Sequence, residues 1–493
     1  MSEHGRLLAD ESLKAAVAEG DSETRSGTGT GYGVRHRVIV LLFFAQGINY
    51  ADRTNLSVAL VSMRKEFGWD AAESGRLLAA FFVGYLCTQM PGGLCAARFG
   101  AKPTLLCGSL VWSFLTALTP WCARQSIHTL LAMRVCIGLA EGVAIPAIVS
   151  LVAAWAPPHE RARFLALTGS GQYIGTVAAF LCAPLCAAWW PGIFYLFGGL
   201  GFAWAAAFGC YVTSTPQQHS AISAAELRLF DESARGAEAE ADGESDGAEP
   251  GGGGERPGLG WVVRRIATEP ALLCICAVHM AGNWTHYLLI SWLPQYLTSL
   301  GLALGSAGKL FSVPYLFALV VDNLGGWFAD EVLLMRCGWS VRRTRRVMQG
   351  FASGLPMLAL AALCSVSEPG LATILLTAAI AGGSLAHAGY GANMIDVCGG
   401  RPELTGLFVS VSNTLGTLPG IVANWSTGRM LAAGGPGGGW PRVFFTAICV
   451  SAVGLGLFMR HAQGHDVFKA RRPSRPVALL PVFGKNDPSR SPH

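Results

Sequence analysis

Charged residues are scarce in this sequence. Only 14% of the 493 residues are Asp, Glu, Lys or Arg, whereas 52% are hydrophobic. Soluble proteins carry about a quarter charged residues, so this chain has too few charges to solvate a globular surface. Windows of about twenty residues nearly free of charge recur along it, each long enough to cross roughly 30 Å of hydrocarbon. The composition therefore predicts a protein that crosses a lipid bilayer many times.

Several catalytic motifs are also absent. The chain has no Gly-rich phosphate loop ending in Lys-Ser or Lys-Thr, no His-Glu-x-x-His metal motif and no nucleophile elbow. ATP-driven machinery is thereby excluded, and an integral membrane enzyme becomes the weak alternative. The basic residues behind the net charge of +5 occupy short loops instead of one face, so no nucleic-acid partner is expected. No cofactor or metal is expected either.

Apolar runs predict an all-α, polytopic membrane protein with twelve transmembrane helices in two pseudo-symmetric halves of six. The second and eighth spans both end in a Gly-Gly pair followed by a basic loop, which indicates an internal repeat at half-chain spacing. The predicted spans are 38–63, 75–97, 103–122, 127–154, 163–187 and 192–213 in the first half, and 270–297, 304–332, 346–366, 369–394, 404–431 and 441–459 in the second.

This pattern divides the chain into five segments. We expect a disordered cytoplasmic tail (1–34), an N-terminal half (35–213), an acidic Gly-rich cytoplasmic linker (214–268), a C-terminal half (269–460) and a cytoplasmic tail (461–493). In the linker, Ser223-Ala-Ala-Glu226 predicts a capping box that opens a short helix on the membrane surface. Basic residues near the span ends predict that both termini are cytoplasmic, in either the plasma membrane or an organelle membrane.

Ionisable residues interrupt two of the spans, although each costs about 2.5–3.5 kcal/mol at the bilayer centre. Asp52 and Arg53 fall in the middle of the first span, and Arg134 and Glu141 project from one face of the fourth. Adjacent helical residues point in different directions, so Asp52 and Arg53 are expected to look toward other helices. A structural Arg53–Glu141 salt bridge and a direct contact of Arg53 with a substrate anion both remain open.

Other polar side chains share the faces of spans five, seven and eleven. His279, Asn283 and His286 lie on one helical face of span seven. Each alone is better explained by bonds between helices, but three together raise the odds of a cavity. Gln172 and Tyr173 in span five and Asn413 in span eleven suit hydrogen bonding to an oxyanion or sugar hydroxyl. Glycines are expected to allow close helix contact instead of binding ligand: Gly138, Gly142, Gly169, Gly171, Gly175, Gly416 and Gly420.

Several of these residues recur in ordered motifs. The motifs are Asp52-Arg53-Thr-Asn55, Gln89-Met-Pro-Gly-Gly93, Arg134-xxx-Gly138-xx-Glu141-Gly142-xxx-Pro146, Asn393-Met-Ile-Asp396 and Ser412-Asn-Thr-Leu-Gly416. Together they resemble the anion:cation symporter family of the major facilitator superfamily, over both halves of the chain. That resemblance implies that Arg53 binds the substrate anion. It also implies that Arg134 and Glu141 are the pair that binds substrate and couples its transport to an ion.

The chain also departs from the family pattern. Ala97 stands where the loop between spans two and three usually carries Asp, beside the basic Arg98 and Lys102, whereas Asp330 keeps the charge in the second half. The altered loop leaves open a transporter-like receptor that binds an anion without cycling. The vesicular glutamate branch has histidine at the position of Leu78 and arginine at that of Gly282, so the resemblance argues against glutamate.

The predicted function is secondary active transport of a small anion, inorganic phosphate or an organic carboxylate, coupled to Na⁺ or H⁺ by alternating access. The protein is not expected to be an enzyme, and its oligomeric state is left open. The predicted site residues are Arg53, Arg134, Tyr173, Asn283 and Asn413 for substrate binding, Asp52, Glu141, His279 and His286 for ion coupling, and Arg98, Lys102 and Asp330 in the conformational loops.

Overall fold

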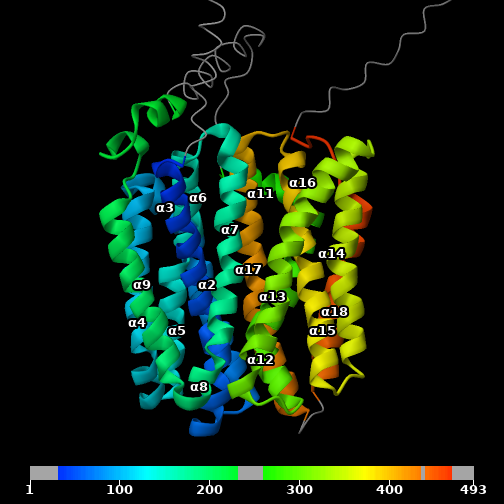
Figure 1. The fold of residues 1–493 in the computed structure, drawn as a ribbon. Coiled ribbons are helices and arrows are strands. Elements are labelled where there is room, and N and C mark those ends of the chain that lie inside the picture. Colours follow the sequence, from blue (N-terminus) through cyan, green and yellow to red (C-terminus); the bar gives the residue numbers. More distant parts are fainter. Residues whose placement is uncertain (1–31, 231–258, 435–438, 469–493) are drawn as a thin grey trace, which may run out of the picture.

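The computed structural model describes residues 32–230, 259–434 and 439–468, which form helices and no strand. Eleven helical segments in these ranges are long and apolar enough to cross a membrane. The long helix α2 (Val34–Phe67) is more polar because it carries Asp52 and Arg53, yet it runs the height of the molecule beside α7 (Figure 1). With α2 the segments make the twelve predicted spans.

The helices of the first half are α3 (Ala71–Phe99), α4 (Ala101–Gln125), α5 (Ile127–Glu141), α6 (Ala144–Trp155), α7 (Pro158–Leu181), α8 (Ala183–Trp189) and α9 (Pro191–Tyr211). Those of the second half are α11 (Leu259–Thr268), α12 (Pro270–Ser299), α13 (Leu304–Trp327), α14 (Val341–Leu363), α15 (Pro369–Ser384), α16 (Tyr390–Val397), α17 (Pro402–Ala433) and α18 (Trp440–His461). Short segments are η1 (Pro216–Gln218), the π-helix η2 (Phe328–Arg336) and η3 (Leu385–His387).

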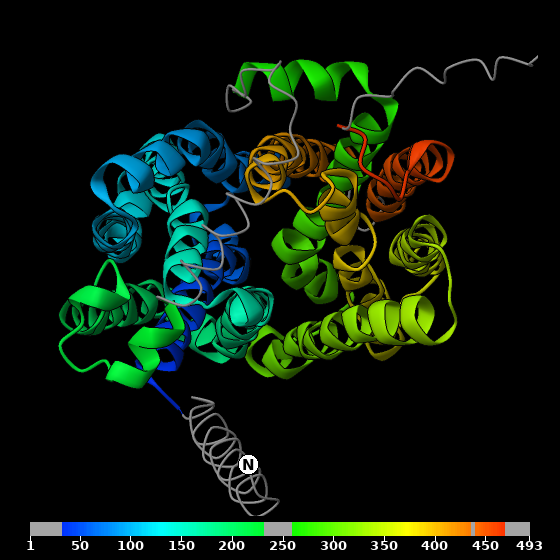
Figure 2. The same ribbon diagram turned by 90° about the horizontal axis from the view of Figure 1, so that it is seen from above.

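The two halves stand side by side. Viewed along the spans, helices α2 to α9 group on one side and α12 to α18 on the other (Figure 2). We call the end where α2 begins and α18 ends the linker end, which is uppermost in Figure 1, and the opposite end, where α8 lies, the far end. The interface between the halves therefore runs from one end of the molecule to the other.

Glycines let helices within each half approach closely. A Cβ atom at Gly138 of α5 would overlap the Phe81 carbonyl of α3, and one at Gly175 of α7 would overlap the Gly47 carbonyl of α2. These contacts confirm the predicted packing role of the glycines. Gly169 is the exception, because the space around its α position is open. The prediction for that one glycine is wrong.

Two spans are interrupted where they approach the middle of the molecule. The fourth span changes from α5 to α6 at Gly142, and the tenth passes from α15 through the 3₁₀ turn η3 to α16. Breaks of this kind free backbone groups and redirect side chains, which is why they recur at functional sites. In this chain the second break carries His387 and Tyr390.

Contacts between the halves are tightest toward the far end. The Ser312 hydroxyl of α13 donates to the Val177 carbonyl of α7 at 3.3 Å. One turn away, the Phe180 ring packs against the rings of Phe311 and Tyr315, with centroids 5.9 and 5.4 Å apart. Toward the linker end, a cavity of about 470 Å³ separates α7 from α13 and η2. Along α7 and α13 the halves therefore meet toward the far end and diverge toward the linker end, and a second hollow of about 480 Å³ lies at the far end between the ends of α2 and α12.

The described ends of the linker fold onto the two halves. The Ser223 hydroxyl accepts the Glu226 backbone N–H, at 3.1 Å, at the start of a helix over 224–230, which is one of the two bonds of the predicted capping box. The Glu226 carboxylate accepts the backbone N–H groups of Val34 and Arg35 at 3.0 and 2.9 Å, satisfying donors that a helix start leaves unpaired. Arg35 also pairs with Glu160 at 2.8 Å. Most of the two predicted tails, and residues 231–258 of the linker, lie outside the described residues.

Candidate functional site

Charged side chains gather in the interior of the N-terminal half. The Arg53 guanidinium Nη2 lies 3.8 Å from Glu141 Oε2, and the Asn49 amide donates to the same oxygen at 3.0 Å. Glu141 is fully buried, and Asp52, Arg53 and Arg134 are between 1 and 6% exposed. Asp52 accepts from the Asn55 amide at 3.3 Å. The structure therefore has the Arg53–Glu141 pair that the sequence left open as one interpretation.

Aromatic rings enclose the Arg53 guanidinium. Its Cζ atom lies 4.7 to 5.9 Å from the ring centroids of Tyr50, Phe81, Phe82 and Tyr85. Arg134 shares one of these rings, with its Cζ 5.1 Å from the Phe81 centroid. A delocalised guanidinium tolerates such faces because the ring quadrupole attracts it. The rings hold Arg53 in place without using its N–H donors, and its Nε and Nη2 have no hydrogen-bond partner.

A separate cavity of about 210 Å³ lies between the halves near the middle of the spans. A water molecule occupies about 30 Å³, so the cavity has room for several waters or a small solute. Its lining is rich in rings and amides that can bond an oxyanion. The polar lining includes Tyr50, Gln172, Tyr173, His279, Asn283, His286, Gln349, Ser384, His387, Tyr390 and Asn413.

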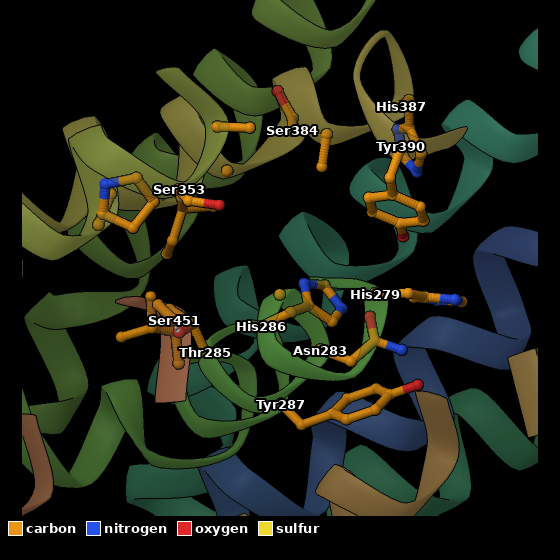
Figure 3. A pocket seen from close by; sticks show the side chains of 18 of the residues that line it. His279, Asn283, Thr285, His286, Tyr287, Ser353, Ser384, His387, Tyr390 and Ser451 are labelled. Carbon is orange, nitrogen blue, oxygen red and sulfur yellow. Dashed lines mark hydrogen bonds between the residues drawn. The ribbon is translucent and has the colours of Figure 1, made fainter. Parts of the chain in front are cut away.

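The polar face of α12 borders this cavity, as Figure 3 shows for His279, Asn283 and His286. His279 Nδ1 lies 2.9 Å from the Ser412 hydroxyl, and the Asn283 amide donates to the Gly416 carbonyl at 2.8 Å. These bonds join α12 to α17. Both interpretations of this face therefore hold at once, since the same side chains connect two helices and line a cavity.

Sequence reasoning missed a second polar cluster at the cavity. The Tyr173 hydroxyl of α7 donates to Asp322 of α13 at 3.1 Å, and His387 Nδ1 of η3 lies 2.8 Å from the other Asp322 oxygen. Asp322 falls inside the predicted span 304–332 and His387 inside 369–394. The rule that drew attention to Arg53 and Glu141, an ionisable residue within a span, would have found both.

The predicted residues thus form two groups. Asp52, Arg53, Arg134 and Glu141 make up the buried cluster, while the cavity is lined by Tyr173, His279, Asn283, His286 and Asn413. Tyr50 connects the groups, because it lines the cavity and its ring faces Arg53. Tyr287, also in the lining, packs on Phe82 with centroids 4.5 Å apart. Neither tyrosine was among the predicted site residues, because the sequence of one span does not show that its ring will lie between the charged cluster and the cavity.

The two predicted conformational loops differ in their contacts. Arg345 of α14 joins Asp330 of η2 at 3.1 Å and Asp396 of α16 at 2.9 Å. In the first half, Arg98 is exposed and the Lys102 ammonium donates to the Gly209 carbonyl at 3.0 Å. Within the described ranges neither of these two cations has a carboxylate partner. Ala97 offers these two cations no carboxylate. The first half therefore lacks an ion-paired loop like the one that Arg345 and Asp330 form in the second half.

We expect Arg345→Ala to lower the apparent melting temperature in detergent by several degrees. Removing one member of a buried ion pair costs about 3–5 kcal/mol, and Arg345 is buried between two carboxylates. Arg336→Ala is the matched control, because its pair with Glu331 is exposed and worth less than about 1 kcal/mol. Equal melting temperatures for the two variants would contradict a stabilising role for the Arg345 network.

Solved structures of known transporters share this architecture. A bacterial homologue of the human lysosomal transporter Spinster, in an inward-facing and unoccupied conformation, aligns over 87% of this chain and 97% of its own, with 17% identity and a TM-score of 0.66. A D-xylose–proton symporter aligns over 87% and 98%, with 14% identity and a TM-score of 0.63. The chain therefore shares the fold of these two proteins.

Sequence comparison makes the assignment narrower. The Major Facilitator Superfamily pattern matches residues 42–424. A probable chloroplastic anion transporter 4 of Oryza sativa subsp. japonica is 33% identical, covering 92% of this chain and 73% of the relative. A chloroplastic ascorbate transporter of Arabidopsis thaliana (30%; 93% and 80%) and human sialin (30%; 87% and 89%) also match. The chain belongs to the major facilitator superfamily and, within it, to the anion:cation symporter family.

Proposed function

We propose that this protein moves a small anion, inorganic phosphate or an organic carboxylate, across its membrane by alternating access, coupled to H⁺ or Na⁺. The relatives named as anion and ascorbate transporters support an anionic substrate. The observation that carries the proposal is the Arg53 guanidinium, which is buried beside the cavity with two nitrogens free of hydrogen bonds. A bidentate carboxylate or phosphate is the partner for which that geometry is suited.

Coupling follows from an exchange of partners at Arg53. In this structure Glu141 lies against the guanidinium at 3.8 Å. An arriving anion would displace Glu141, and a buried carboxylate without a cation would then take up a proton or Na⁺. Asp52 directly precedes Arg53 in the chain and is also buried, so it is a second candidate for taking up the proton or Na⁺. Anion and cation would therefore bind together.

The orientation follows from the basic loops. Arg35, Arg98, Arg161, Arg264 and Arg345 all lie at the linker end, where the positive-inside rule assigns the cytoplasm. On that assignment both termini are cytoplasmic, and the cavity toward the linker end faces inward. The tight contact at the far end is then the closed outer side of the transport cycle.

Uptake by the purified protein in liposomes tests the proposal. Phosphate, glutamate, sialate, sugar acids and ascorbate would be offered separately, each under an H⁺ gradient and then under a Na⁺ gradient. We expect at least one phosphate or carboxylate to accumulate and only one of the two gradients to drive it. No accumulation of any of these anions would contradict the proposal.

A receptor that binds an anion without cycling is the second candidate. The unpaired Arg98 and Lys102 favour it, since the first half lacks the ion-paired loop formed by Arg345 in the second. Counterflow of labelled anion against unlabelled anion separates the two functions. Binding without counterflow would indicate the receptor, and we expect counterflow.

Closure at the far end depends on Gly75. A Cβ atom there would lie 2.7 Å from the Asn424 carbonyl oxygen and 2.9 Å from Gly428 Cα, so α3 and α17 could not approach as they do. We expect Gly75→Leu to lower uptake by about tenfold or more, because overpacking costs about 1–3 kcal/mol and shifts the balance of the two states. The measurement is initial uptake rate in liposomes.

Gly199→Leu on α9 is the matched control, since nothing lies within 4 Å of its α position. Both variants would first be checked for a single symmetric peak on size exclusion. Equal uptake by the two well-folded variants would contradict a gating role for the α3–α17 contact.

A further inference from the structure

A polar chain of three residues crosses from one half of the protein to the other. Tyr173 on α7 donates to Asp322 Oδ2 on α13 at 3.1 Å, and His387 on η3 lies 2.8 Å from Asp322 Oδ1. Other described hydrogen bonds between the halves, such as Ser312 to Val177 and Thr417 to Gln89, contain no titratable group. The function proposed above uses Arg53 and Glu141 and leaves this chain without a role.

The Asp322–His387 pair stands where two cavities adjoin. His387 lines both the central cavity and the cavity toward the linker end, whereas Tyr173 lines the first and Asp322 the second. The His387 side chain is 57% exposed to these spaces and that of Asp322 only 16%. A solute entering from the linker end would therefore pass His387 before it reaches the α12 face, across from which His387 lies in Figure 3.

The other titratable groups around the pair do not cancel its charge. Asp330 and Arg345 line the linker-end cavity, but Arg345 is already shared between Asp330 and Asp396. The groups that face the pair from neighbouring elements are Tyr173 on α7, His279 and His286 on α12, and Tyr390 on α16. With Asp322 counted as a carboxylate, the formal charge of the Asp322–His387 pair is therefore zero when His387 is protonated and negative when it is not.

We propose that Asp322 and His387 form a proton-binding site that couples protons to anion binding, in addition to the Arg53–Glu141 pair. The inference rests on the proposed anion transport. A protonated pair is itself neutral, whereas loss of the proton leaves a carboxylate that repels an anion across a poorly screened space. Since linkage is reciprocal, proton binding tightens anion binding and anion binding tightens proton binding by the same factor.

Tyr173 has a different role from that of the Asp322–His387 pair. Its hydroxyl donates to Asp322 Oδ2, whereas His387 contacts Oδ1, so a change in the charge of His387 leaves this hydrogen bond in place. The bridge between α7 and α13 therefore holds the carboxylate in position, and the charge of His387 changes beside it. Tyr173→Phe should weaken anion binding without changing its ratio between two pH values.

The test measures anion binding to the full chain in detergent at about pH 5.5 and about pH 8, which bracket the usual range of histidine. Gluconate, ascorbate and inorganic phosphate serve as probes, in choline medium and again in Na⁺ medium. Wild type should bind about tenfold more tightly at the lower pH. His387→Gln should bind weakly at both pH values, because Asp322 then stays unpaired.

Asp322→Asn combined with His387→Gln should bind at both pH values about as tightly as wild type does in acid. All variants are compared again in a Glu141→Gln background, which removes any pH dependence of that carboxylate. Glu331→Gln, which removes an exposed carboxylate from η2, is the matched control and should keep the wild-type ratio. Melting curves identify any variant that does not fold.

Three results would overturn the inference. The first is that the double variant keeps the wild-type ratio of anion affinities at the two pH values. This result would not contradict the proposed anion transport. The second is tight binding by wild type at the higher pH in Na⁺ but not in choline, which assigns the site to sodium. The third is no binding of any probe to wild type at either pH, which overturns the proposed function as well.

Discussion

Arg53→Ala is expected to lower anion uptake by roughly 100-fold or more. Each hydrogen bond from a guanidinium to a charged partner contributes about 1.5–3 kcal/mol, and a bidentate anion would lose two. The change also leaves Glu141, which is fully buried, without its cation at 3.8 Å. Initial uptake in liposomes measures the first effect, and the melting temperature measures the second.

A companion variant separates binding from folding. Arg53→Lys keeps the positive charge near Glu141 but loses the planar fork and the stacking on Tyr50 and Tyr85. We expect it to recover most of the melting temperature and little of the uptake. Arg124→Ala, at an exposed helix end, is the control and should change neither. Uptake by Arg53→Ala within threefold of wild type would reduce Arg53 to a structural ion-pair partner.

Glu141→Gln should have the second largest effect, and it should act on coupling more than on binding. In wild type the Asn49 amide donates to the Glu141 carboxylate at 3.0 Å. The oxygen of the substituted side chain can still accept this hydrogen bond, so the contact between α2 and α5 survives. The substituted side chain cannot titrate or compete for Arg53. We expect gradient-driven uptake to fall about tenfold or more, while counterflow without a gradient stays within a few-fold of wild type.

The two assays use the same liposomes and the same anion, so protein content cancels from their ratio. Asn49→Ala serves as the control, because it removes the hydrogen bond to Glu141 and leaves the charge. Normal coupled transport by Glu141→Gln would contradict the exchange of partners, and would assign coupling to Asp52 or to the Asp322–His387 pair.

The number and order of spans could be predicted from the sequence because each span must be apolar over its whole length. The pairing of Arg53 with Glu141 was within reach for a related reason, since a buried charge needs a partner at its own depth. By the same reasoning Asp322 and His387 were predictable but were overlooked. Their sequence context, Val321-Asp322-Asn323 and Ala386-His387-Ala388, is as apolar as that around Arg53.

Other features depend on how helices face each other, and no single span encodes that. Tyr50 separates the charged cluster from the cavity because its ring centroid lies 4.7 Å from the Arg53 guanidinium carbon and the same residue lines the cavity. The sequence places Arg53 and the α12 residues in one site, whereas the structure has a wall between them.

The contact between Glu226 and the start of α2 bears on how the two halves can be made. Glu226 caps the start of α2, the first helix of the N-terminal half, and Arg265 of α11 bonds the Val467 carbonyl beyond α18 in the C-terminal half. A chain cut at any position from 231 to 258 would leave Glu226 on the first fragment and α11 on the second. Two polypeptides expressed together from separate messages should therefore reassemble into one transporter, because each fragment keeps both partners of its own hydrogen bond.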